Sequence, residues 1–107
     1  MEKGPSIFAK YWTSERNEIY HFYALADEFG YTQITEYSMA ATEFAKSESK
    51  DIISFTAKDG RIFKYDTETN EFIILSHGGK IITYFPPENG IEYFYGQFSE
   101  YGGYWND

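Results

Sequence analysis

Residues 51–85 read DIISFTAKDGRIFKYDTETNEFIILSHGGKIITYF, and this stretch decides the fold. Four short runs rich in Ile, Phe and Tyr alternate with three polar segments. Isoleucine and aromatic residues favour strands, while Asp-Gly and Gly-Gly pairs are typical of hairpin turns. Pro86 and Pro87 end the last run, because proline has no N–H to donate to a sheet. The stretch therefore predicts a four-stranded antiparallel meander.

Before the strands, over 13–48, apolar residues recur with the period of a helix. Ser14 can cap a first helix, whose apolar residues return every three or four positions until Gly30. A second helix is predicted from about Thr35, with its own apolar stripe, and it ends at the polar segment KSESK. The sequence therefore predicts two amphipathic helices ahead of the sheet.

The order of these segments defines the fold class. Helices followed by a run of strands predict one α+β domain over 1–107, with the two helices packed on one face of the sheet. The other face would stay partly open and would offer a binding or catalytic surface. Residues 1–12 are expected to form an irregular arm, and 90–101 a short C-terminal helix or an irregular aromatic segment. The tail GGYWND is expected to be loose, with docking of Trp105 as the alternative.

The composition limits the chemistry of the protein. The chain has 107 residues, no cysteine, and two histidines, His21 and His77, that lie far apart. The lack of cysteine excludes a disulfide scaffold and a thiolate metal site, and we expect neither a metal nor a cofactor. No apolar run approaches the roughly 20 residues of a membrane span, and the first residues do not resemble a signal peptide. We therefore expect a cytoplasmic protein without membrane contact.

Charge and aromatic content indicate the kind of partner. The formal net charge is −8, from 17 acidic and 9 basic residues, and aromatic residues make up 21% of the chain. The aromatic residues can build a firm core. The acidity argues against simple electrostatic binding of nucleic acid, because affinity for phosphates comes mostly from Lys and Arg. The negative charge either keeps the protein soluble or attracts a basic partner.

Two segments resemble a known family. HFYALADEFGYTQITEYSMAATEF and, after it, DGRIFKYDTETNEFIILSHGGKIITYFPPENGIEYFYGQF are similar to C-terminal ribonuclease toxin domains of polymorphic and contact-dependent inhibition systems. The resemblance covers about residues 19–98 and rests on YD-x-x-TNEF, a glycine turn, I-x-TYF-x-P and GI-x-YF. These domains belong to the barnase/EndoU/colicin/RelE-like group, and related ones are carried by phage-encoded proteins. The resemblance implies N-terminal helices, a four-stranded antiparallel sheet and an RNA-cleaving ancestor, often a tRNase.

The same resemblance implies a set of candidate catalytic residues. Metal-independent RNA cleavage needs a base for the 2′-OH, an acid for the leaving oxygen and cations for the phosphate. The first histidine of the family's first-helix stretch matches His21, and the threonine of its last strand matches Thr83. The candidate catalytic residues are His21, Thr83, Arg61 and Lys64. Each also has an ordinary structural alternative, as a half-buried histidine, a β-branched strand residue or a solvent-facing cation, and His77 is expected to be a solvated turn residue.

The chain departs from the family pattern at two places. Ala24 and Leu25 stand where the family has a Lys-His pair, and Ile82 stands where it has a basic residue before the threonine. Apolar side chains neither transfer protons nor bind phosphate. The resemblance therefore implies a retained fold with a partly eroded catalytic set.

A second set of residues suits a protein-binding surface. The segment 92–105 has more aromatic side chains than one side of a short helix can bury, so some must be exposed or covered by a partner. Exposed aromatic anchors with an acidic rim are typical of protein interfaces. Strand tyrosines can stack on a base or pair across strands. The candidate binding residues are Tyr65, Tyr84, Glu92, Tyr93, Phe94, Tyr95, Glu100, Tyr101, Tyr104 and Trp105.

Three functions remain open from the sequence. The favoured one is a toxin-derived domain without catalysis that inhibits a nucleic-acid-handling protein by occupying its basic surface. Small acidic proteins of this kind resemble phage-encoded inhibitors such as anti-CRISPR proteins, whose carboxylates stand in for phosphates. The second is an active metal-independent ribonuclease that cleaves tRNA and has a cognate immunity protein. The third is an immunity-like partner of a basic toxin.

Overall fold

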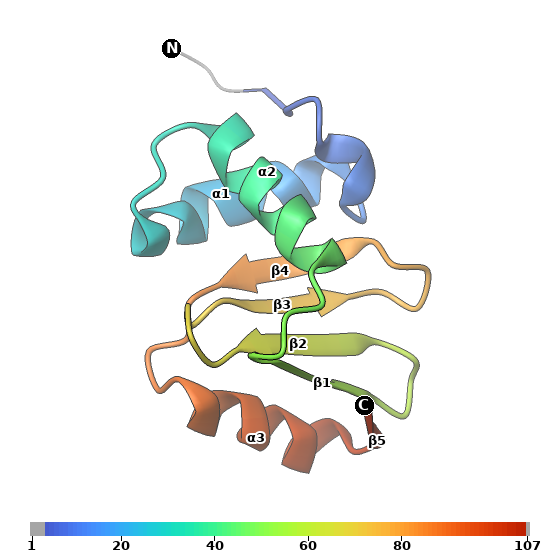
Figure 1. Ribbon diagram of the computed structural model, residues 1–107. Helices are drawn as coiled ribbons and strands as arrows, with labels where there is room; N and C mark the ends of the chain where they lie inside the picture. Colours follow the sequence, from blue (N-terminus) through green and yellow to red (C-terminus); the bar gives the residue numbers. More distant parts are fainter. Residues whose placement is uncertain (1–3, 107) are drawn as a thin grey trace.

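The computed structural model describes residues 4–106 and has the predicted α+β fold (Figure 1). Two helices come first, α1 (Glu15–Phe29) and α2 (Ile34–Lys46). Four strands follow, β1 (Ile52–Thr56), β2 (Ile62–Asp66), β3 (Phe72–Leu75) and β4 (Ile81–Phe85). The remaining elements are a short 3-10 helix before α1, η1 (Ala9–Tyr11), the helix α3 (Ile91–Tyr101), and a fifth strand, β5 (Tyr104–Asn106). The segment 90–101 is thus mainly a helix rather than irregular.

The ends of α1 are where the sequence signals place them. The Ser14 hydroxyl accepts a hydrogen bond from the backbone N–H of Asn17 at 3.0 Å, which caps the start of the helix. Gly30 ends the helix with a φ of 88°, in the left-handed region that only glycine adopts without strain. The second helix begins at Ile34, next to the predicted start at Thr35.

All five strands pair in one antiparallel sheet, in the order β4-β3-β2-β1-β5. The register is interrupted on β4. Thr83 lies opposite Ile74, but Ile81 lies opposite Leu75, so Ile82 is an extra residue that forms a β-bulge. The bulge places Thr83 on the same face as Ile74, whereas an uninterrupted strand would place it on the face of Ile81.

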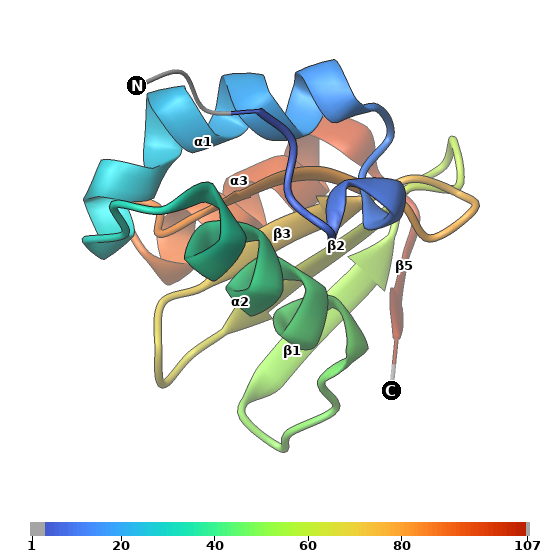
Figure 2. The same ribbon diagram turned by 90° about the horizontal axis from the view of Figure 1, so that it is seen from above.

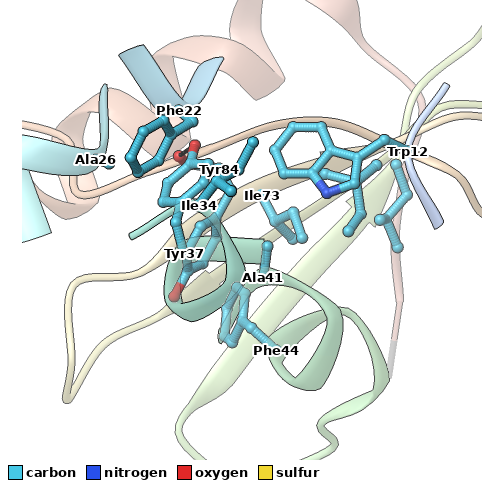
Figure 3. Close-up of a cluster of buried hydrophobic side chains, with 11 residues drawn as sticks. Trp12, Phe22, Ala26, Ile34, Tyr37, Ala41, Phe44, Ile73 and Tyr84 are labelled. Carbon is cyan, nitrogen blue, oxygen red and sulfur yellow. Dashed lines mark hydrogen bonds between the residues drawn. The ribbon is translucent and has the colours of Figure 1, made fainter. Parts of the chain in front are cut away.

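Helices cover both faces of the sheet (Figures 1 and 2). On one face α1 and α2 pack against β3 and β4, around a core that includes Trp12, Tyr37 and Tyr84 (Figure 3). On the other face α3 packs against β2, and Phe94 joins a core that includes Phe63. The expectation that this second face stays open is wrong, because the aromatic segment after β4 is apolar enough to be buried against it. The uncovered area lies instead on the α1–α2 face, over β1 and β5.

The segment expected to be an irregular arm is a docked part of the domain. Residues 1–3 lie outside the described part, but within 4–12 the chain forms η1 and then buries Trp12, which is 2% exposed. The N–H of Thr13 donates to the Ile81 carbonyl at 3.0 Å, and the Asn17 amide donates to the Ile82 carbonyl at 2.9 Å. These bonds occupy backbone acceptors along the outer edge of β4, which protects that edge from pairing with another chain.

The tail expected to be loose contains the fifth strand. β5 pairs with β1, with Trp105 opposite Phe55 and Asn106 opposite Ser54. The indole of Trp105 stacks on the Phe98 ring with centroids 4.3 Å apart. Strand pairing with β1 and ring stacking against α3 therefore hold the tail in place through Asn106, the last described residue.

Candidate functional site

The sheet separates two candidate catalytic residues, His21 and Thr83. His21 lies half-buried on α1 beside Trp12, and the ring centroids are 6.0 Å apart. Its Nδ1 lies 3.0 Å from the Asn17 carbonyl and donates to it, since a carbonyl only accepts. Burial lowers the pKa of His21, and this hydrogen bond acts in the opposite direction. Thr83 faces the other way, towards the α3 side of the sheet, so the two side chains do not share a site.

Lys64 closes the end of α2 instead of facing solvent. Its ammonium donates to the carbonyls of Phe44, Ala45 and Ser47 at 3.3, 3.0 and 2.8 Å. These acceptors are at or just after the C-terminus of α2, where carbonyls have no partner within the helix. Burial lowers the pKa of Lys64, while the Glu48 carboxylate acts in the opposite direction. The structural alternative of a solvent-facing strand residue is wrong for Lys64, because its side chain is buried under the end of α2.

Arg61 lies at the β1–β2 turn and faces the α3 side. Its Nε is 2.8 Å from an Asp59 carboxylate oxygen, and its guanidinium lies 4.5 Å from the centroid of the Tyr101 ring. Lys64 faces the α2 side, so the two cations are on opposite faces. The four candidate catalytic residues therefore do not form one site.

Three of the candidate binding residues are core residues. Tyr65, Tyr84 and Phe94 are all buried. The Tyr65 hydroxyl donates to the Asn70 side chain at 2.6 Å, and the Tyr84 hydroxyl donates to the Glu71 carboxylate. The two tyrosines are therefore not available to stack on a base, and pairing within the core is their role in this structure.

Five of the other candidates are exposed on α3 and β5. We call these residues the α3 surface, and they are Glu92, Tyr95, Glu100, Tyr101 and Trp105. Its aromatic side chains are exposed by 49% for Tyr95, 36% for Tyr101 and 43% for Trp105. The Tyr95 and Trp105 rings meet edge to face at 5.8 Å, and Trp105 rests on buried rings beneath it. The exposed rings are thus held in place by the core, as preorganised binding anchors require.

The remaining two aromatic candidates lie elsewhere. Tyr93 is half-buried, with its ring 5.2 Å from Phe72 and 5.6 Å from Phe85. Tyr104 is 64% exposed but lies opposite Thr56, so the strand alternation points it to the face away from α3. The predicted patch is therefore smaller than the sequence suggested.

The α3 surface has no basic residue of its own. Residues 81–106 include Glu88, Glu92 and Glu100 but no lysine or arginine. The cations at its border are Lys58 and Arg61 of the β1–β2 turn, and Arg61 is paired with Asp59. The three glutamates of the segment itself favour an approaching cation.

A second group of carboxylates gathers where α2 begins and the β2–β3 turn ends. Burial raises the pKa of the Tyr31 phenol, and the nearby charges of Glu71, Glu36 and Glu43 raise it further. No lysine or arginine occurs between residues 17 and 45 or between 65 and 79. This acidic end was not singled out from the sequence, although the absence of basic residues in both segments was a signal for it.

A groove that sequence reasoning missed occupies the uncovered part of the sheet. It is a hollow of about 710 Å³ between the sheet and the connection from α2 to β1. Three lysines, one glutamate, three serines and three large apolar residues line it, along with Ala45 and Asn106. We call it the lysine groove, defined by Lys46, Lys50, Ile52, Ile62, Lys64 and Leu75. The KSESK segment supplies its wall, but its floor comes from three different strands, which no local pattern connects.

Comparison with protein-family models gave no match to this chain, and a search of curated proteins found no relative. None of the helices within residues 4–106 has the length and apolar character needed to cross a membrane. Over the same residues, no three His, Asp or Glu side chains come together in a way that could hold a metal ion.

Proposed function

We propose that this protein is a non-catalytic binding protein that inhibits a nucleic-acid-handling partner by occupying its basic surface. The observation that carries the proposal is the α3 surface, where three exposed aromatic rings supported by the core share α3 and β5 with Glu92 and Glu100, in a segment without a basic residue. In this proposal the fold descends from a ribonuclease toxin domain and no longer cleaves RNA.

The placement of the candidate catalytic residues supports binding over catalysis. General acid–base cleavage needs a base, an acid and a phosphate-binding cation around one scissile bond. Here His21 contacts Trp12, Lys64 is hydrogen-bonded to helix carbonyls, and the sheet lies between them and Thr83. Bringing these groups to one phosphate would require unfolding the sheet.

The chemistry of the α3 surface supports a partner rich in arginine or lysine. The chain itself provides an example, because the Arg61 guanidinium lies over the Tyr101 ring while it pairs with Asp59. A cation over an aromatic ring next to a carboxylate gains both a cation–π and an ionic contact. Tyr95, Trp105 and Glu92 offer the same combination to a partner. The acidic end around Tyr31 adds long-range attraction and speeds association.

The test is affinity capture from host lysate with the proteins identified by mass spectrometry, followed by titration of the captured protein. The key variant is Tyr95→Ser combined with Trp105→Ser, and a second variant is Glu92→Lys combined with Glu100→Lys. The matched controls are Tyr23→Ser and Glu15→Lys on α1, since both residues are exposed and lie far from α3 in the fold. We expect a nucleic-acid-binding protein to be captured, in competition with added DNA or RNA and weakened by salt.

The outcomes separate the three functions. Loss of capture in the α3 variants but not in the α1 controls supports the proposal. Capture of a toxin whose nuclease activity is then neutralised favours an immunity protein instead. Cleavage of purified total tRNA by the wild-type protein, lost in His21→Ala, contradicts the proposal and favours the ribonuclease. Failure to capture any nucleic-acid-handling protein also contradicts it.

A further inference from the structure

The lysine groove exists because the two N-terminal helices cover only half of their face of the sheet. α1 and α2 pack mainly against β3 and β4, and neither helix packs to a comparable extent against the same face of β1 or β5. Figure 1 shows the connection from α2 descending across the strands to β1. This connection forms one wall of a hollow whose volume falls in the range of small-molecule sites, about 300–1,000 Å³.

The floor of the groove is apolar. Ile52, Ile62 and Leu75 come from three adjacent strands, and the alternation of side chains places them on this face. Ile52 and Ile62 remain partly exposed although they are large aliphatic residues. The body of an apolar ligand could displace water from these side chains and gain the free energy of burial.

The rim is basic in a protein that is strongly acidic overall. Among the described residues, Lys46, Lys50 and Lys64 line the hollow with one carboxylate, Glu48. The one salt bridge within residues 4–106 joins Arg61 to Asp59, so none of these lysines is paired with a carboxylate of those residues. A concave surface with an excess of one sign of charge focuses the field into the hollow.

Lys64 also removes a feature that would repel an anion. The C-terminus of α2 points towards the groove, and the end of a helix bears a partial negative charge on its free carbonyls. The Lys64 ammonium is hydrogen-bonded to three carbonyls at this point, which offsets that charge. Lys50 can then attract a ligand together with Lys46, whose ammonium lies 5.0 Å from the centroid of the Tyr11 ring, beside the hydroxyls of Ser47 and Ser54.

We propose that the lysine groove binds a small organic anion, a molecule with an apolar body and a phosphate, sulfonate or carboxylate group. The apolar body lies on Ile52, Ile62 and Leu75, and the anionic group is held by Lys46 and Lys50. The site is separate from the α3 surface, because the two lie on opposite faces of the sheet. The inference therefore stands or falls independently of the proposed protein partner.

The test uses two probes with the same ring system. One is 8-anilinonaphthalene-1-sulfonate, and the other is N-phenyl-1-naphthylamine, which lacks the sulfonate. Each is titrated into the full chain by ¹H–¹⁵N NMR, which locates the binding site. We expect the sulfonate to shift the amide signals of Ser47, Ser54 and Leu75, and the neutral amine to bind at least about tenfold more weakly.

The key variant is Lys46→Gln combined with Lys50→Gln. Both lysines are exposed, so the fold should be kept, and the unperturbed spectrum of the variant checks this. We expect about a tenfold loss of affinity for the sulfonate and little change for the amine. The matched control is Lys58→Gln, an exposed lysine on the β1–β2 turn that does not line the groove. Equal binding of the two probes, unchanged affinity in the double variant, binding at another surface, or no binding of the sulfonate would each overturn the inference.

Discussion

Replacing Glu18 is expected to release the N-terminal arm and to destabilise the whole domain. The Glu18 side chain is fully buried on α1 and forms no ion pair within residues 4–106. It accepts hydrogen bonds from the backbone N–H of Ser6 at 3.1 Å, from the Ser6 hydroxyl and from the Ser38 hydroxyl. One carboxylate thus joins the arm, α1 and α2.

The size of the effect follows from these three bonds. Hydrogen bonds to a charged group contribute about 1.5–3 kcal/mol each, and a buried donor left unsatisfied costs about 1–3 kcal/mol. Relief of the desolvation of the carboxylate offsets part of the loss. For Glu18→Ala we therefore expect a decrease of about 3 kcal/mol in the free energy of unfolding, or roughly 12 °C in Tm. Glu18→Gln keeps the shape and one acceptor oxygen, so about half of this loss is expected.

The assay is urea unfolding followed by tryptophan fluorescence and circular dichroism. Trp12 is buried at the end of the arm, so Glu18→Ala should also shift its emission to the red and speed proteolysis before residue 14. A double-mutant cycle, in which Ser38→Ala is measured alone and in combination with Glu18→Ala, gives the coupling energy between the Ser38 hydroxyl and the Glu18 carboxylate. The control is Glu15→Ala in the exposed first turn of the same helix. A loss below about 1 kcal/mol, with the arm still protected, would refute the reasoning, because desolvation would then cancel the hydrogen bonds.

Three further predictions concern titration and the end of α2. Burial raises the pKa of the Tyr37 and Tyr84 phenols, so above about pH 10 the unfolded chain loses protons that the folded chain keeps. The free energy of unfolding, measured with urea, should therefore fall as the pH rises. A free energy that stays constant from about pH 9 to 11 would contradict this. Burial lowers the pKa of His21 below 6.5, so the unfolded chain takes up this proton first, and stability should be lost as the pH falls below about 6.5. An NMR titration of the imidazole checks the direction of the shift, and His21→Gln should flatten the loss. Lys64→Met keeps the aliphatic stem but removes three hydrogen bonds to carbonyls at the end of α2. We therefore expect the free energy of unfolding to decrease by about 1–2 kcal/mol and amide hydrogen exchange at the end of α2 to become faster. Unchanged exchange there would show that water caps the helix equally well.

The features that the sequence determined by itself are those with local causes. The start of α1 depends on a hydrogen bond from the N–H of Asn17 to Ser14, three residues before it. The end of α1 depends on the positive φ that Gly30 adopts without strain. The turns of the meander likewise follow from glycines with positive φ at Gly60 and Gly79. Composition alone was enough to predict exposed aromatic residues near the C-terminus, since there were too many to bury.

The tertiary structure decided everything that joins distant residues. β5 forms because the Trp105 ring packs on Phe98 of α3 while its backbone pairs with Phe55, a contact between residues far apart in sequence. The bulge at Ile82 turns Thr83 to the α3 face. The sequence does not reveal this one-residue shift of the strand register, because the residues of β4 are apolar on both faces of the sheet.

The candidate sites also combine local features with features set by tertiary packing. The lysines and serines of KSESK can be read from the sequence, but Lys64 becomes a cap of α2 only when β2 lies under that helix. The lysine groove needs a floor from β1, β2 and β3, and the α3 surface needs a core beneath its rings. Residue type and local spacing set the helices and turns, because their hydrogen bonds span a few residues. The packing of helices on both faces of the sheet set which side chains meet, because burial depends on the whole chain.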